Sequence, residues 1–454
     1  MRSAVFVCKA FLLIGLLVFA GCRNETKLPE NRSGSERAVE QAVRISPDGL
    51  DGAEPAIASD PEGNLYVVYV GHNDRKSADV YLQKYDKGLT AVGERVRINP
   101  DAGTAKAWRG DPPTVAVGSS GSVYVGWTQG VESGGKSGND LLLSVSSDGG
   151  KSFASPVKVN DDTKPASHGM HSLAVDKDGK VYFAWLDERN IEIKEHVENL
   201  GDTLNEVQPP SDLQFVKIHH NSNSAEKLKE PVKPEMEAAE PNSEVYFAVS
   251  ADGGKTVSAN KKIAGDVCPC CKTSLLSAAD GTLYVSWRQV LPGDLRHIAV
   301  ASTKDKGATF SEKTIVSDDK WKLNACPVSG AAMANGKGNS LKIFWYTAGD
   351  AGPAGIYFAE SKDGGRSFGE RTLLSSAASG TPVAFDEISD VSKCLFAVND
   401  NRIKLGETGK SSSDTNGAIE DASLPAATMA NGKIYAAFVR ADGEKRSVWI
   451  SPIR

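Results

Sequence analysis

The chain has 454 residues, a formal net charge of −6, and 24% charged, 40% hydrophobic and 7% aromatic residues. This balance is typical of a folded globular protein and excludes a chain that is disordered throughout. The slightly acidic composition provides no basic stripe for nucleic acid, so the sequence predicts no nucleic-acid partner.

The first 22 residues are typical of an export signal. Arg2 and Lys9 flank a short first segment, residues 10–19 are apolar, and residues 19–22, Phe-Ala-Gly-Cys, resemble a lipobox. An apolar run of about ten residues is too short to span a bilayer as a permanent helix. We therefore predict a lipoprotein signal peptide over 1–22, a lipidated Cys22, and an exported protein anchored to the cell envelope on its periplasmic or cell-surface side. An ordinary cleaved signal or a buried helix is the alternative.

Residues 23–41 are polar and charged and predict a flexible tether, because they contain little that could be buried. Residues 42–454 are predicted to form a single domain that the tether holds off the membrane. Their short, scattered apolar stretches favour an all-β fold.

A phrase of the form Ser/Thr-x-Asp-x-Gly-x-Ser/Thr, followed by an aromatic or apolar residue, occurs four times. It is a turn signal, because aspartate accepts hydrogen bonds from nearby backbone N–H groups, glycine takes a positive φ, and the apolar residue returns to a packed strand. Its recurrence at intervals of tens of residues indicates an array of repeated units. The copies span residues 146–153, 250–257, 303–310 and 361–368.

This phrase resembles the Asp-box (BNR) repeat, and through it the chain resembles the sialidase-like β-propeller family from about residue 42 onward. The resemblance implies four-stranded blades with the box in the turn between the third and fourth strands. Asp-boxes also occur in propellers without sialidase activity, so the function has to be inferred from other residues.

Seven inner hairpins can be counted from a second pattern: an apolar strand, a turn, usually with glycine, and an alternating strand that usually ends in an aromatic residue. Gly63, Gly121 and Gly179 are 58 residues apart, which suits a four-stranded blade. The sequence thus predicts seven units, against six blades in the family's sialidases, with a polar insertion at 190–242 in unit 3. We expect residues 42–45 to pair with 447–450 and close the ring. The hairpins span residues 55–69, 112–127, 171–185, 272–287, 327–345, 382–398 and 425–438.

In a propeller, the segments that lead into the inner strands and those that leave the second strands open on the face opposite the Asp-boxes, here called the mouth. Alignment on the turn glycines places Asp111, Gly169, Cys271 and Cys326 at equivalent positions around one ring. Polar residues near these positions and after the second strands are therefore expected to converge near the axis, the usual ligand position. They are Glu54, Arg109, His168, His171, Asp187, Glu188, Arg189, Cys268, Cys270, Arg288 and Tyr346.

The five cysteines after Cys22 cannot all pair within one monomer. Three of them, Cys268, Cys270 and Cys271, stand within four residues, and Cys326 is predicted beside Cys271 in the next unit. One interpretation is one or two disulfides that tie units together.

The other interpretation is a metal centre, in which those four thiolates and an imidazole of His168 or His171 hold copper or zinc. The fifth cysteine, Cys394, lies in an apolar strand and is expected to be a buried thiol.

The resemblance to sialidases implies a further set of roles. These enzymes clamp a substrate carboxylate with three arginines, use a tyrosine activated by a glutamate as nucleophile, and protonate with an aspartate. The family's Phe/Tyr-Arg-Ile-Pro segment is absent, since the nearest strings, residues 43–46 and 96–99, lack both the proline and the aromatic residue. The candidates for the clamp are Arg109, Arg189 and Arg288. The candidates for catalysis are Tyr346 as the nucleophile, Asp111 as the acid, and Glu188.

Three functions remain open at this point. The first is binding of a glycan or other acidic small ligand at the mouth, with glycoside hydrolysis of exo-sialidase type as its catalytic form. The second is a metal-binding or thiol-redox protein of the cell envelope. The third is a non-catalytic platform for protein interactions.

Overall fold

The computed structural model describes residues 42–74, 77–191, 242–323, 327–388, 391–398, 401–409 and 418–453. The predicted signal peptide with Cys22, the tether, Cys326 and nearly all of the predicted insertion lie outside these residues. The described chain is all-β apart from a short 3-10 helix, η1 (Lys337–Asn339), and belongs to one compact unit, Gln41–Arg454. Among the described residues, no helix is long and apolar enough to cross a membrane.

The strands form four-strand antiparallel units, each with an inner hairpin followed by two further strands. Unit 1 comprises β2 (Asp51–Ser59), β3 (Leu65–His72), β4 (Ala78–Tyr85) and β5 (Ala91–Arg97). Unit 2 comprises β7 (Thr114–Val117), β8 (Val123–Ser133), β9 (Lys136–Ser146) and β10 (Val157–Lys158). Unit 3 comprises β11 (His168–Val175), β12 (Val181–Asp187), β13 (Ser243–Ser250) and β14 (Lys261–Val267). Unit 4 comprises β15 (Ser274–Ser277), β16 (Leu283–Leu291), β17 (Leu295–Thr303) and β18 (Thr314–Ile315).

The same order continues in the second half of the chain. Unit 5 comprises β19 (Ala331–Asn335), β20 (Leu341–Thr347), β21 (Gly355–Ser361) and β22 (Thr372–Ser375). Unit 6 comprises β23 (Ala378–Ile388), β24 (Val391–Val398), β25 (Arg402–Glu407) and β26 (Ala418–Ile419). Unit 7 comprises β27 (Ser423–Ala430), β28 (Lys433–Asp442), β29 (Lys445–Ile453) and, from the other end of the described chain, β1 (Val43–Arg44).

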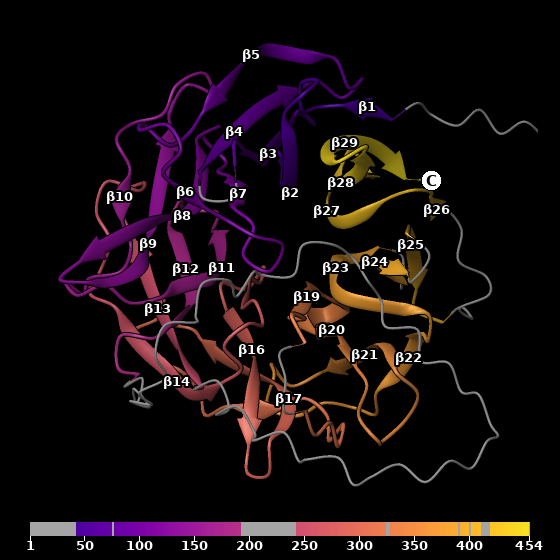
Figure 1. Cartoon of the computed structure of the whole chain (residues 1–454). Coiled ribbons are helices and arrows are strands. Elements are labelled where there is room, and N and C mark those ends of the chain that lie inside the picture. The colour runs from indigo at the N-terminus through magenta and orange to yellow at the C-terminus, as the bar shows by residue number, and fades with distance from the viewer. Residues whose placement is uncertain are drawn as a thin grey trace, which may run out of the picture. The chain divides into compact units, whose positions relative to one another are not determined.

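The predicted inner hairpins are all present, and so is the predicted pairing of the two ends of the domain. Val43 of β1 lies opposite Ile450 of β29 in an antiparallel ladder. The first strand of each unit contacts the first strand of the next, and β27 contacts β2. In Figure 1 the units follow one another in chain order around a common centre, from β2 to the yellow strands of unit 7.

Two connections between units were not predicted. The short strand β6 (Ala105–Lys106) pairs with both β4 and β8 and so joins units 1 and 2 into one sheet. A single pair, Val267 with Gln289, joins units 3 and 4 in the same way. In both cases the segment that approaches an inner strand bridges the two neighbouring units.

The Asp-box turns form as their chemistry predicts. Asp148 accepts hydrogen bonds from the backbone N–H groups of Lys151 and Ser152, both at 3.0 Å, and from the hydroxyl groups of Ser146 and Ser152. Gly150, at φ 88°, closes the turn, and a side chain at this backbone angle would be strained. The boxes at 250–257, 303–310 and 361–368 repeat this arrangement between the third and fourth strands of their units.

The core of several units is organised around a tryptophan at the fifth position of the second strand. Trp127, Trp185, Trp287 and Trp345 are fully buried, and each indole N–H donates to a nearby polar side chain. Their burial removes large apolar surfaces from water without leaving the N–H unpaired. These residues hold the second strands in register, so that the chain beyond them reaches the mouth at a fixed place.

Candidate functional site

At the mouth, the start of unit 2 is bonded directly to the start of unit 3. The buried carboxylate of Asp111 accepts a hydrogen bond from the Met170 N–H at 2.6 Å and lies 3.2 Å from Nδ1 of His171. Met170 sits in a bulge at φ 52°, and a Cβ on Gly169 would lie 2.7 Å from the Asp111 carboxylate. The bulge and the missing side chain of Gly169 are therefore what allow this contact.

The other ring nitrogen of His171 is buried and makes no hydrogen bond within the described residues. The same is true of the Thr114 hydroxyl. Both atoms face Gly126, since a Cβ there would lie 3.0 Å from Nε2 of His171 and 2.6 Å from Oγ1 of Thr114. A histidine oriented by a carboxylate on one side, with its second nitrogen unpartnered, has the arrangement of a proton-transfer group.

Unit 4 contributes a lysine to the same place. Its neighbour Thr273 donates to the carbonyl groups of Met170 and Ala184, at 3.0 and 2.9 Å, which fixes this segment against unit 3. Lys272 is half-buried, and burial lowers the pKa of its ammonium group to about 8, although the negative charge of Asp111 acts in the opposite direction. The ammonium group is thus partly withdrawn from water, which disfavours its charged form.

The loop that leads to Asp111 carries an exposed aromatic ring and an exposed guanidinium group. Trp108 is 44% exposed and Arg109 is exposed, on the loop that runs from β6 to Asp111. The Trp108 carbonyl accepts the Asp111 N–H at 2.8 Å, and a Cβ on Gly110 would lie 2.4 Å from the indole ring. The loop is therefore folded tightly against Asp111 while its two large side chains face solvent.

Unit 1 contributes a network of charged groups. A second bulge puts Glu54 at φ 47° and buries its carboxylate 2.6 Å from Nε2 of His72 and 3.3 Å from the Arg446 guanidinium. Arg446 also holds Asp51 at 2.8 Å. Glu54 thus links His72, on the opposite strand of the hairpin, with Arg446 of unit 7.

The arginines proposed for a carboxylate clamp have separate partners. Arg189 binds Asp187 and Asp161, packs over the Tyr246 ring, and has its pKa raised by these carboxylates against the effect of burial. Arg109 is exposed, as described above. The structure does not bring these two guanidinium groups together.

Arg288, the third clamp candidate, is fully buried. It donates to the carbonyls of Ser329 and Tyr346, each at 2.9 Å for Nη2, and lies over the Trp321 ring. The guanidinium is therefore held by backbone oxygens and by an aromatic ring. The structure does not place it in an open pocket with Arg109 or Arg189.

The proposed nucleophile and its activating acid also have other partners. Tyr346 packs edge-on against Trp321, and burial raises the pKa of its phenol. Glu188 accepts a hydrogen bond from Ser243 at 3.2 Å. No contact between Tyr346 and Glu188 occurs among the described residues, so the sialidase-type pair is not assembled there.

The cysteines of the 268–271 segment form a sulfur cluster. The Sγ atom of Cys268 lies 3.2 Å from that of Cys271 and 3.9 Å from that of Cys270, and the three sulfurs lie within 4.8 Å of one another. Cys270 is disulfide-bonded, whereas Cys268, Cys271 and the separate Cys394 are free thiols. A hydrogen bond from Cys271 lowers the pKa of Cys268 to about 6 against desolvation, and Arg288 acts in the same direction.

The histidines proposed as metal ligands are not part of this cluster in the described residues. His171 is held by Asp111, as above. Nδ1 of His168 lies 2.6 Å from the Asn139 carbonyl oxygen, and its Nε2 lies 3.2 Å from Asp162, although without hydrogen-bonding geometry. Within the described residues the atoms that could hold a metal together are the three sulfurs alone, and the mixed Cys/His set stays a prediction.

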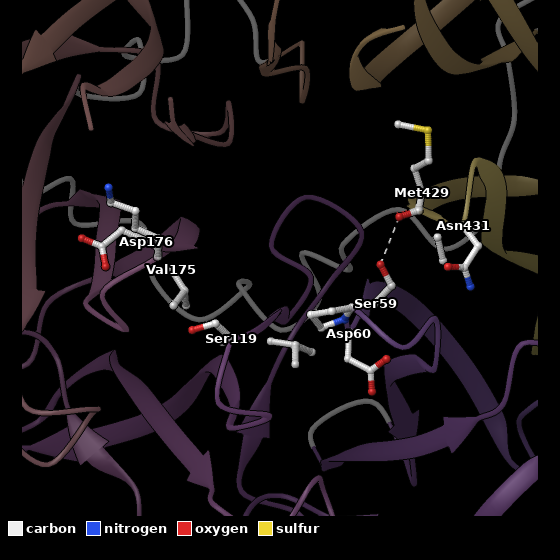
Figure 2. Close-up of a pocket in the computed structure, with 12 residues that line it drawn as sticks. Ser59, Asp60, Ser119, Val175, Asp176, Met429 and Asn431 are labelled. Atoms are coloured by element: carbon white, nitrogen blue, oxygen red, sulfur yellow. Dashed lines mark hydrogen bonds between the residues drawn. The ribbon is translucent and has the colours of Figure 1, made fainter. Parts of the chain in front are cut away.

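Two cavities lie away from these groups. One, of about 470 Å³, is lined by the turns that follow β2, β7, β11 and β27 (Figure 2). Its carboxylates are turn residues: Asp60 binds Asn64 and Tyr66, and Asp176 binds Tyr182. The other, of about 700 Å³, lies between β14 and the third Asp-box. We give more weight to the mouth, because buried titratable groups from three units meet there.

Lys272 and Trp108 were missed by the sequence analysis. Lys272 directly follows Cys271, which the alignment on the turn glycines places at a position equivalent to Asp111. That alignment could have identified Lys272. Trp108 carries no such signal, because its exposure depends on the fold of the loop around Gly110.

No protein-family model and no curated protein matches the chain. Among solved structures, an ulvan lyase of a new polysaccharide lyase family matches with a TM-score of 0.54 and 12% identity over 91% of this chain and 96% of that one. The NanB sialidase of Streptococcus pneumoniae matches with a TM-score of 0.46 and 14% identity, over 86% and 83%. At these identities the likeness concerns the fold alone: the chain has an all-β fold that resembles the propellers of such enzymes.

Proposed function

We propose that this protein binds an acidic glycan at the mouth. The proposal rests on one observation: the exposed Trp108 and Arg109 lie on the loop that ends at Asp111, whose carboxylate also binds His171 and acts on Lys272. An aromatic face can cover the apolar side of a sugar ring, and cations can pair with its carboxylate or sulfate groups. The buried polar groups beside them can fix the orientation of a ligand.

We further propose that the domain is a closed seven-bladed propeller. The cyclic sequence of contacts between the first strands supports this, because it ends where it began, with β27 against β2. The pairing of β1 with β29 supports it as well, because it completes the last unit with a strand from the other end. In a closed ring the groups of units 2, 3 and 4 face a common axis.

A polyanionic sugar fits the charges at the mouth better than a neutral one. One ulvan lyase structure of this fold, with a TM-score of 0.52, is described as bound to a chain of glucuronate and sulfated rhamnose. That ligand belongs to the other protein. It supports the same chemical class here because Lys272 and Arg109 offer cations and Trp108 offers a ring face.

Turnover of the same glycan is the second candidate. It is favoured by the Asp111–His171 pair and the unpartnered Nε2 of His171. We assign His171 the role of proton acceptor in this case. Release of reducing ends from an acidic polysaccharide by the wild type, and its loss in His171→Gln, would support catalysis; equal release by both would exclude this role.

Attachment to the cell envelope through a lipid on Cys22 completes the proposal, and it rests on the lipobox alone. Metabolic labelling with a fatty acid should mark the wild type and not Cys22→Ala. Label in both proteins would contradict the anchor.

Calorimetric titration with a uronate-containing oligosaccharide and with its carboxyl-reduced form tests the binding proposal. We expect the wild type to bind the acidic form more tightly, and Trp108→Ala to lose about tenfold in affinity. Leu373→Ala is the matched control, because Leu373 is an exposed apolar residue of β22, outside the mouth. Equal affinity for the two sugars, or equal loss in both variants, would refute the proposed site.

A further inference from the structure

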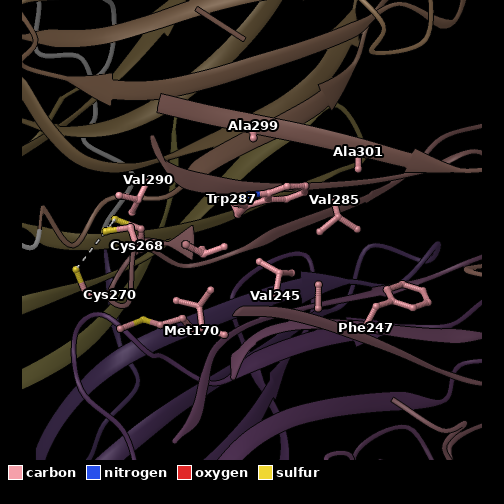
Figure 3. Packing of buried hydrophobic residues seen from close by; sticks show 14 of the residues in the cluster. Met170, Val245, Phe247, Cys268, Cys270, Val285, Trp287, Val290, Ala299 and Ala301 are labelled. Carbon is pink, nitrogen blue, oxygen red and sulfur yellow. Dashed lines mark hydrogen bonds between the residues drawn. The ribbon is translucent and has the colours of Figure 1, made fainter. Parts of the chain in front are cut away.

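The sulfur cluster at the start of unit 4 is a site that glycan binding does not use. Cys268 and Cys271 are completely buried and have no disulfide partner, yet their sulfur atoms lie 3.2 Å apart (Figure 3 draws the cluster around Cys268). Cys270 is committed to a disulfide. The cluster thus offers two thiols that can act together on one small partner.

The surroundings of these thiols are positively charged. Arg288 and Arg296 are buried, and among the described residues no ion pair joins either of them to a carboxylate. Arg288 is held by carbonyl groups, its own carbonyl accepts the Cys268 N–H at 2.9 Å, and Nη1 of Arg296 has no hydrogen-bond partner in this part of the chain. Buried cations without an acid partner are costly, and they favour a negative charge on the nearby sulfurs.

The remaining neighbours are soft or apolar. Met170 packs in the same cluster, together with Val267, Trp287 and Val290. Within the described residues, no carboxylate and no imidazole belongs to the group of atoms that could ligate a metal with these cysteines. A hard cation such as Mg²⁺ or Ca²⁺ would find no oxygen ligands here.

We propose that Cys268 and Cys271 bind one copper(I) ion as two thiolates. Soft thiolate ligands suit copper(I). Zinc is disfavoured, because its structural sites use four nitrogen, sulfur or oxygen ligands and this segment has only two free thiols. Two thiolates and one copper(I) carry a net charge of −1, which neutralises one of the two buried guanidinium charges. The site does not depend on the proposed glycan binding.

The test is an anaerobic titration of the full chain, purified without reductant so that the Cys270 disulfide stays intact, against a colorimetric copper(I) chelator. We expect the wild type to remove one equivalent of copper(I) from the chelator, and Cys268→Ser and Cys271→Ser each to bind at least about 100-fold more weakly. Cys394→Ser is the matched control, because Cys394 is a buried free thiol in β24, outside the cluster. It should bind like the wild type.

A second measurement avoids variants that fail to fold. X-ray absorption at the copper edge of the loaded wild type should show a first shell made of sulfur alone. No uptake by the wild type, undiminished uptake by the Cys268→Ser/Cys271→Ser double variant, or a first shell with nitrogen or oxygen would each overturn the proposal.

Discussion

Single aspartates in this protein stabilise turns by accepting hydrogen bonds while they remain exposed. In the third box, the Thr309 hydroxyl and backbone N–H groups lower the pKa of Asp305 to about 2, and equivalent bonds lower the pKa of Asp148, Asp252 and Asp363 further. An unfolded aspartate has a pKa near about 3.9. The unfolded chain therefore binds more protons as the pH falls below about 4, and the folded state loses stability in that range.

Replacement of one such carboxylate should change the acid response. Asp305→Asn should lower the thermal midpoint at neutral pH by roughly 2–4 °C, because the Thr309 bonds weaken, and should flatten the fall between about pH 4 and about pH 2. The measurement is the thermal midpoint as a function of pH. Asp48→Asn is the control, since that side chain is 93% exposed and forms only a surface ion pair. If the thermal midpoints of wild type and Asp305→Asn fell equally with decreasing pH, the lowered pKa of Asp305 would not contribute to the acid sensitivity.

At the scale of strands, β1, near the start of the domain, completes unit 7 by pairing with β29. The Ile45 N–H, just after β1, donates to the Val448 carbonyl of β29 at 2.8 Å, and Ile45 packs in the core between units 1 and 7. Without this segment, β29 would present an unpaired edge to solvent.

Ile45→Pro tests the role of this segment, because proline removes the N–H and leaves the Val448 carbonyl with only the longer bond from the Ser46 N–H, at 3.4 Å. We expect a loss of about 1–3 kcal/mol in the free energy of unfolding and a rise in light scattering as exposed β29 edges associate. Ile45→Val keeps the backbone bond and should cost no more than about 1.5 kcal/mol. If Ile45→Pro has the same free energy of unfolding as Ile45→Val and stays monomeric, β1 does not protect the edge of β29.

The sequence was sufficient for the hairpins and the Asp-boxes because both depend on local chemistry. The turn glycines and box aspartates are bonded to residues within a few positions, as in the Asp148 turn. The bridges through β6 and through Val267 were not predictable, because they join strands of different units. The separation of Arg189 from Arg288 was not predictable for the same reason. Arg189 binds Asp161 and Arg288 binds the Ser329 carbonyl, and both partners come from distant segments.

At the scale of the whole molecule, the mouth gathers groups from units that are far apart in sequence. Asp111 of unit 2 binds the start of unit 3, and Thr273 of unit 4 binds the same segment from the other side. Lys272 directly precedes Thr273 and is half-buried, and the charge of Asp111 acts on its ammonium group. Its proton is lost at a pH where a surface lysine would keep it.

The affinity for a uronate oligosaccharide, measured by calorimetry from about pH 6 to about pH 10, tests the proposed acidic-glycan site most directly. Because the pKa of Lys272 is about 8, the wild type should bind with constant affinity below that pH and lose up to about tenfold per pH unit above it. Lys272→Arg, which stays charged, should keep its affinity throughout, and Lys272→Gln should bind weakly at every pH. Binding by Lys272→Gln that equals the wild type at about pH 7 would contradict the account.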